Sequence, residues 1–100
     1  MDIVRGSDRF FIFMTTQKNA TQTTIKTYKS NLNDFIRTLK IRDLEEINIF
    51  KIDEYAAVLA TRTGRDGKAL SARTIKNKLV VIRTFLEYFH NRDLIDFNPR

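Results

Sequence analysis

Two sets of side chains are spaced so that each set would share one helix face and could bind phosphate; they are basic, hydroxyl and amide side chains, together with one valine. Lys and Arg supply positive charge, and hydroxyl and amide groups add hydrogen bonds to phosphate oxygens. If residues 22–40 and 72–91 are helical, a rotation of about 100° per residue places each set away from the apolar stripe of its own helix. The sets are Thr23, Lys26, Thr27, Ser30 and Arg37, and Arg73, Lys76, Asn77, Val80 and Thr84. No acidic residue precedes Asp34 or Glu87 in these segments, so the pattern predicts a phosphate-binding surface.

Side chains suited to catalysis are few. His90 is the only histidine and Cys is absent, so a Cys–His pair or a zinc site lacks its residues. Tyr28 and Tyr55 fall in apolar stripes and Tyr88 at the margin of one, where packing is the expected role. The acidic residues between 43 and 54 lack the spacing of a calcium loop. We therefore expect no catalytic residue, no metal, no cofactor and no small-molecule substrate.

Charge is divided unevenly along the chain, which has a formal net charge of +6. Residues 21–40 hold four basic residues and one acidic residue, a net of +3, and residues 61–90 hold seven basic and two acidic residues, a net of +5. Between them, residues 41–60 hold two basic and five acidic residues, a net of −3. The two basic segments favour a polyanionic partner such as DNA. Ordinary solvated helix faces also carry such charges, and the charge pattern alone leaves that alternative open.

Apolar residues recur with helical spacing and predict four helices, at about residues 8–19, 22–40, 49–62 and 72–91. Thr21, Asn48 and Ser71 stand where an N-cap side chain would accept the first free backbone amides of the last three helices.

The first helix is expected to begin after Ser7 as its N-cap. It carries the large apolar residues Phe10, Phe11, Phe13 and Met14 and is too short to be stable without packing on the others. No segment alternates in the manner of a strand, so the predicted fold class is all-α.

The overall composition suits one domain without a membrane segment. The 100 residues are 42% hydrophobic and 30% charged, as expected for a single globular core. The longest apolar run, Phe10–Met14, has five residues, far short of the roughly 20 that span a bilayer. The absence of Cys fits a reducing compartment, and we expect a cytoplasmic location.

The connection from Thr63 to Leu70 is rich in Gly and basic residues. It is about twice as long as the turn of a DNA-binding helix-turn-helix. Its Gly64 and Gly67 are too close together for a phosphate-binding P-loop, and Ala69 follows Lys68 where that motif needs Ser or Thr. The segment is therefore expected to be a flexible basic connector.

Three ordered blocks of caps and apolar residues carry a resemblance. They are Thr21-x-x-Thr24-Ile25-x-x-Tyr28-x-x-x-Leu32-x-x-Phe35, then Ile47-Asn48 opening a helix with Ile52 and Tyr55, and Leu70-Ser71-x-x-Thr74-Ile75-x-x-x-Leu79-x-x-Ile82-Arg83-x-Phe85-Leu86-x-Tyr88, ending in Leu94-Ile95-x-x-Asn98-Pro99. The set, spanning about residues 8–100, resembles the SAM-like core-binding domain of tyrosine recombinases, the phage integrase family. No single block is specific, and their order is what carries the likeness.

The resemblance implies a small orthogonal four-helix bundle that forms one jaw of a clamp around DNA, with its second and fourth helices toward the major groove. Its implied partners are double-stranded DNA and other protomers of the recombinase. Carried over by position, the implied DNA-binding residues are Thr23, Lys26, Thr27, Ser30, Arg73, Lys76, Asn77 and Val80. The family's catalytic tyrosine and its Arg, His and Lys residues belong to a C-terminal domain. That domain is expected after residue 100, so the chain itself is not expected to be an enzyme and is expected to be a fragment or a truncated product.

A second interpretation is a helical protein-interaction module that binds an acidic partner or a neighbouring subunit. The four large apolar residues of the first helix distinguish the two, because they would favour a protein partner if they stayed exposed.

Overall fold

The structure is a computed structural model that describes residues 1–99, and Arg100, the last residue of the expected domain, lies outside the described residues. It contains the α-helices α1 (Ile3–Thr16), α2 (Gln22–Leu39), α3 (Ile49–Thr61) and α4 (Ala72–His90), and a short 3-10 helix η1 (Leu44–Glu46). Over residues 1–99 the β-structure is limited to two isolated bridges, Asp2–Asp43 and Thr63–Ala69. The predicted all-α class is confirmed.

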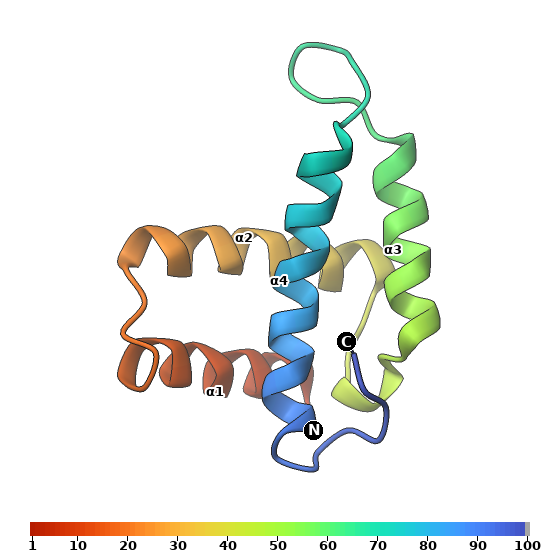
Figure 1. Cartoon of the computed structure of the whole chain (residues 1–100). Helices are drawn as coiled ribbons and strands as arrows, with labels where there is room; N and C mark the ends of the chain where they lie inside the picture. Colours follow the sequence, from red (N-terminus) through yellow and green to blue (C-terminus); the bar gives the residue numbers. More distant parts are fainter. Residues whose placement is uncertain (100) are drawn as a thin grey trace.

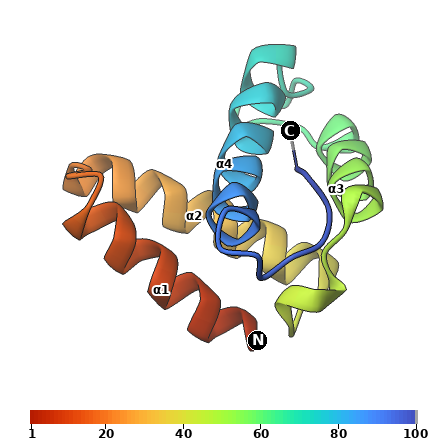
Figure 2. The same cartoon turned by 60° about the horizontal axis from the view of Figure 1, so that its bottom comes forward.

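The four helices form two antiparallel pairs that cross each other. Figure 1 shows α1 and α2 lying side by side, with α4 crossing α2 and α3 standing beside α4. Figure 2 shows the same arrangement from a second direction, with the α1–α2 pair projecting away from α3. The arrangement is an orthogonal four-helix bundle, in which the N-terminal half of α2 extends beyond the crossing with α4.

The start of α1 differs from the expected one. The helix begins at Ile3 and not after Ser7, because the Asp2 carboxylate caps it by accepting hydrogen bonds from the backbone N–H groups of Val4 (2.7 Å) and Arg5 (3.4 Å). The Ser7 hydroxyl instead donates to the backbone carbonyl of Ile3 within the helix. The apolar stripe of α1 includes Gly6, which gave no hydrophobic signal in the sequence.

Gly6 is buried because Phe89 of α4 packs directly on it. A Cβ atom added at Gly6 would lie 3.2 Å from the Phe89 ring. The helix also ends at Thr16, earlier than the expected residue 19. The chain turns at Asn19, whose φ of 50° lies in the left-handed region that Asn tolerates.

The other three helices have the N-caps that the sequence predicts. The side chains of Thr21, Asn48 and Ser71 accept hydrogen bonds from backbone N–H groups three residues later, at 3.2, 3.1 and 3.1 Å. Helices α2, α3 and α4 begin at the expected residues and end at Leu39, Thr61 and His90, one residue before the expected ends.

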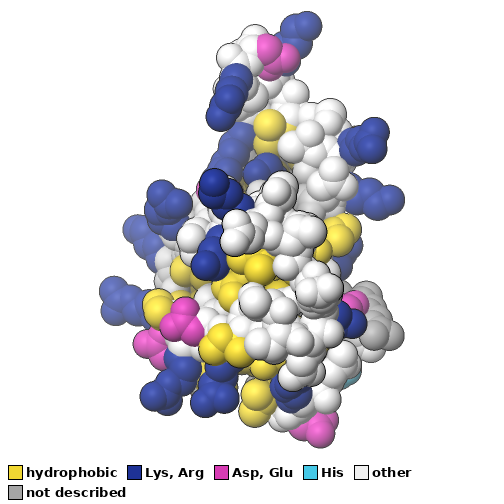
Figure 3. All heavy atoms as spheres, turned by 90° about the vertical axis from the view of Figure 1, so that its left-hand side faces the viewer, with side chains coloured by type: hydrophobic (Ala, Val, Ile, Leu, Met, Phe, Trp, Pro, Cys, Tyr) yellow, Lys and Arg dark blue, Asp and Glu magenta, His cyan; other side chains and the backbone are white. Residues whose placement is uncertain are grey.

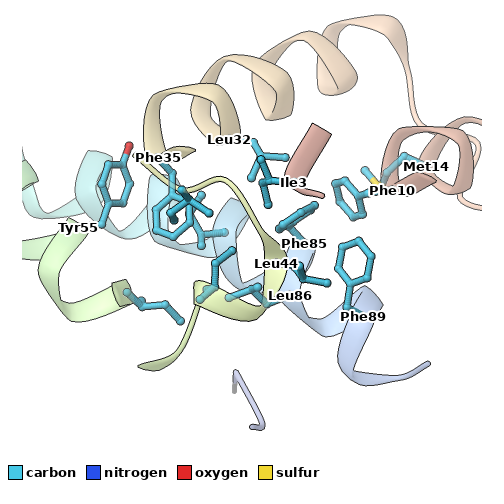
Figure 4. Packing of buried hydrophobic residues seen from close by; sticks show 14 of the residues in the cluster. Ile3, Phe10, Met14, Leu32, Phe35, Leu44, Tyr55, Phe85, Leu86 and Phe89 are labelled. Carbon is cyan, nitrogen blue, oxygen red and sulfur yellow. The ribbon is translucent and has the colours of Figure 1, made fainter. Parts of the chain in front are cut away.

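The core is built around aromatic side chains from all four helices. Phe10 of α1 packs edge-on against Phe85 of α4 with their ring centroids 5.3 Å apart, and Phe85 packs against Phe89 at 5.0 Å. At the other end of the core, Phe35 of α2 meets Tyr55 of α3 at 5.1 Å. Figure 4 shows these two groups at opposite ends of one continuous cluster. The core therefore fixes the crossing of the two helix pairs.

Candidate nucleic-acid interface

The eight residues predicted to bind DNA are all exposed, and they lie on two helices that cross. Thr23, Lys26, Thr27 and Ser30 occupy the N-terminal half of α2, and Arg73, Lys76, Asn77 and Val80 occupy the N-terminal half of α4. In Figure 1 these halves extend in different directions from the crossing, α2 sideways and α4 upward, so they border an open corner.

A hydrogen bond holds the two helices together at this corner. The Lys78 ammonium of α4 donates to the Asn31 side-chain oxygen of α2 at 2.9 Å. Thr27 and Thr23 lie one and two turns before Asn31 on the same side of α2, so this row of hydroxyl groups leads up to the crossing. The contact therefore sets the predicted face of α2 directly beside α4.

Two shallow hollows open along the predicted face of α2. The first is lined by Lys26, Thr27, Ser30 and Asn31, and the second by Gln22, Thr23, Ile25, Lys26 and Lys29. Their lining combines ammonium, hydroxyl and amide groups, which are the donors that phosphate oxygens accept from. Because both hollows are open to solvent, they suit contact with the surface of a large partner better than enclosure of a small ligand.

Basic side chains dominate the face of the molecule that contains this corner. Figure 3 shows Lys and Arg side chains from the upper end of the molecule to its lower edge, with hydrophobic patches among them, mainly in the middle and lower part. The N-terminal halves of α2 and α4 contain no acidic residue. On α4, Val80 is 42% exposed and adds an apolar contact group to the polar face.

A second polar cluster ties α2 to α3 behind the corner, and it is centred on Asp34. The Asp34 carboxylate accepts hydrogen bonds from the Tyr55 hydroxyl and from the Arg62 guanidinium, the latter at 2.7 Å. Arg62 also donates to the Thr38 hydroxyl at 2.9 Å. These contacts join the C-terminal half of α2 to the middle of α3 and to Arg62, the residue that follows its last turn.

The protonation of this cluster follows from its contacts. Burial raises the pKa of Asp34, but the hydrogen bonds from Arg62 and Tyr55 and the positive charges of Arg62 and Lys78 outweigh burial, so the pKa lies below its ordinary value of 3.8. Burial and the neighbouring Asp34 carboxylate raise the pKa of the Tyr55 hydroxyl. Asp34 is therefore ionised and Tyr55 protonated at neutral pH, which fits a structural ion pair.

Sequence reasoning missed the residues that join the elements. Asn31, Asp34, Arg62 and Lys78 are polar residues at the edges of apolar stripes, and their partners are 21 to 47 residues away along the chain. Lys78 gave the one available signal, because it falls close to the apolar stripe of its helix, where a lysine lays its stem along apolar surface and carries its ammonium group to the edge.

The aromatic residues of α1 pack in or against the core of the molecule. Phe10 and Met14 are buried, and Phe11 and Phe13 are half-buried against the core. The apolar side chains that α1 exposes are Val4 and Ile12. Because these four residues pack on the core and do not stay exposed, they do not favour the protein-interaction module.

Neither a metal-binding cluster nor a membrane-spanning helix occurs over residues 1–99. Over residues 1–99, no three His, Cys, Asp or Glu side chains are placed to hold a metal ion. None of the helices in the described part of the chain is long and apolar enough to cross a membrane. His90 lies in the last turn of α4.

Comparison with known proteins finds a family model that matches most of the chain. The family model of the phage integrase N-terminal SAM-like domain matches residues 7–93. The chain is 29% identical over 100 residues to tyrosine recombinase XerC of Bacillus subtilis (strain 168), a match that covers 99% of this chain and 32% of that protein. The chain thus spans about a third of the length of this relative, and no solved structure gives a significant match. The match over most of its length places this chain in the family of phage integrase N-terminal SAM-like domains.

Proposed function

We propose that this chain is the DNA-binding module of a site-specific tyrosine recombinase and that it clamps duplex DNA through the exposed faces of α2 and α4. The observation that carries the proposal is the corner at which two acid-free faces meet, joined by the Lys78–Asn31 hydrogen bond. The similarity to a protein named tyrosine recombinase supports the same assignment.

Each side chain at the corner has a role that its chemistry suits. Lys26, Arg73 and Lys76 would contact phosphates and supply most of the affinity, which is independent of sequence, and Arg73 would also bias the choice of sequence. Asn77 can form a bidentate pair with adenine in the major groove, and Val80 can contact a thymine methyl group. The hydroxyls of Thr23, Thr27 and Ser30 would donate to phosphate oxygens.

The chemistry of strand transfer would reside outside this chain. The Tyr55 hydroxyl is engaged by Asp34 and its elevated pKa opposes formation of the nucleophilic phenolate. We infer that a C-terminal catalytic domain supplies the reacting groups in the whole recombinase and that other protomers join this module on DNA.

The first test is a titration of the 100-residue chain against a generic duplex by fluorescence anisotropy at several salt concentrations. With about five phosphate contacts, the logarithm of the binding constant should fall with the logarithm of salt concentration with a slope of about −4 to −5. Absence of binding at low salt, by a chain that circular dichroism shows to be folded, would contradict the proposal. The interaction with an acidic protein partner would then become the leading function.

Two substitutions on α4 separate phosphate contact from base contact. Lys76→Ala should weaken binding to all duplexes by a similar factor and make the salt slope shallower by about 1. Asn77→Ala should instead change the preference among duplex sequences, with a cost of about 1–3 kcal/mol at the preferred site. If Lys76→Ala left the affinity unchanged at every salt concentration, the phosphate contact proposed for α4 would be wrong.

A further inference from the structure

The connection between α3 and α4, expected to be a flexible linker, is an ordered turn. We call residues 63–70 the α3–α4 loop. Its two arms meet at the Thr63–Ala69 bridge, and the Gly64 N–H donates to the Lys68 carbonyl at 2.6 Å. At the tip, the Gly67 N–H donates to the Gly64 carbonyl at 3.0 Å. The backbone of the loop is therefore closed by its own hydrogen bonds.

The loop is also anchored at both of its ends. Arg62, the residue before it, is held by Asp34 and Thr38 of α2 at 2.7 and 2.9 Å. Leu70, at its end, packs against the core and its N–H donates to the Arg62 carbonyl at 3.4 Å. These anchors fix the base of the loop relative to α2 and α4.

Two of the exposed side chains of this ordered loop are basic. Arg65 and Lys68 are exposed, and the one acidic residue, Asp66, turns an oxygen inward to accept the Lys68 N–H at 3.0 Å. The loop directly precedes the end of α4 that carries Arg73 and Lys76. Figure 1 shows it standing beyond this end of α4, and Figure 3 shows basic side chains continuing from it down the face that contains the corner.

We propose that the α3–α4 loop is a third DNA-contacting element, in which Arg65 and Lys68 bind backbone phosphates beyond the stretch covered by α2 and α4. This inference rests on the proposed function of the chain. Phosphate is the expected ligand, because the exposed loop side chains that carry hydrogen-bond donors are mainly charged ones that suit phosphate oxygens. A loop that is ordered before binding loses less conformational entropy on contact than a flexible connector would.

The test compares two double variants that each remove two positive charges. R65Q/K68Q neutralises the loop, and R42Q/K51Q neutralises exposed or half-exposed residues before η1 and in α3, away from the corner. Each 100-residue chain is titrated against the same generic duplex over a range of salt concentrations, after circular dichroism and thermal unfolding have shown that it is folded. R65K/K68R, which keeps both charges, is the third variant.

R65Q/K68Q is expected to make the salt slope shallower by about 2, since each phosphate contact contributes about 0.9. With equal binding at 1 M salt, that change corresponds to about 60- to 100-fold weaker binding at 0.1 M salt. R42Q/K51Q should change the slope by less than about 0.5, and R65K/K68R should retain the wild-type slope.

The outcomes separate this inference from the function on which it rests. If the wild-type chain binds and the loop variant has the slope of R42Q/K51Q, the loop does not contact DNA and the inference is overturned while the proposed function stands. If the wild-type chain does not bind duplex DNA at low salt, both fail.

Discussion

Asp34 is the side chain on which the polar contacts between α2 and α3 converge. Its carboxylate accepts from Tyr55 and Arg62, and the Thr38 hydroxyl lies 3.5 Å from its other oxygen. A half-buried carboxylate with two strong donors is stabilised in its charged form, and removing it would leave the Arg62 guanidinium without its partner. The effect of this residue on stability should therefore depend on pH.

Asp34→Asn should lower the free energy of unfolding by about 1–3 kcal/mol at pH 7, because hydrogen bonds to a charged group are lost. The pKa of Asp34 is lower in the folded protein than its ordinary 3.8, so its contribution is fully present above the unfolded value and is lost as pH falls through the folded value. Urea unfolding in steps from pH 7 to pH 2.5 measures this. The wild-type and variant curves should begin to converge as the pH falls below about 3.8 and should meet once the pH lies below the lowered pKa of Asp34.

Asp53→Asn is the matched control, because Asp53 is an exposed carboxylate on α3. It should change the free energy of unfolding by less than about 0.5 kcal/mol at pH 7. If Asp34→Asn had the same free energy of unfolding as the wild type at pH 7, the cluster would not stabilise the packing of α2 on α3.

At the scale of elements, the helix starts and turns depend on a few residues whose conformation or size is critical. The Asp2 cap lengthens α1 so that Ile3 reaches the core, and Gly6 lets Phe89 approach the helix backbone. In the α3–α4 loop, Gly67 has a φ of 77°, in the left-handed region that favours glycine. A Cβ atom at Gly67 would meet nothing within 4 Å, so only the backbone conformation opposes a side chain there.

Gly67→Ala should therefore lower the free energy of unfolding by about 1–2 kcal/mol through backbone strain alone. Gly67→Asn should cost clearly less, since Asn tolerates the left-handed region. Thermal unfolding of both variants measures the difference. Equal stability of the two variants and the wild type would exclude a left-handed backbone at this position.

For the whole molecule, the docking of α1 decides whether the bundle closes. Phe10 is 1% exposed and contacts Phe85 and Tyr88 of α4 as well as Tyr28 of α2, so it joins α1 to both neighbours. Ile12, two residues later on the same helix, is 62% exposed. The two positions thus provide a buried and an exposed site on one element.

Phe10→Ala should lower the free energy of unfolding by about 3–5 kcal/mol, because it removes a fully buried ring and leaves a cavity. Since a small domain is stable by only about 5–15 kcal/mol, this is a large share of the total. Ile12→Ala should cost less than about 1 kcal/mol. Urea unfolding monitored by far-ultraviolet circular dichroism compares the two, and similar losses for both would contradict the packing of α1 described here.

The sequence alone determined the helical class, three of the four N-caps and both candidate faces, because these depend on local hydrogen bonds and on a periodicity of 3.6 residues. Thr21, Asn48 and Ser71 act within three residues of themselves, so their roles need no tertiary information. The start of α1 was not predicted because Gly6 interrupts its apolar stripe. A glycine fits there because Phe89, 83 positions later in the chain, packs directly on the helix backbone.

Tertiary structure decided how the two faces are placed relative to each other. The crossing of α2 and α4 depends on the shared aromatic core and on Lys78 reaching Asn31, 47 residues away along the chain. It also decided that the α3–α4 loop is ordered, through the anchoring of Arg62 by Asp34. Such contacts between distant residues depend on the packing of whole helices, which local spacing in the sequence does not encode.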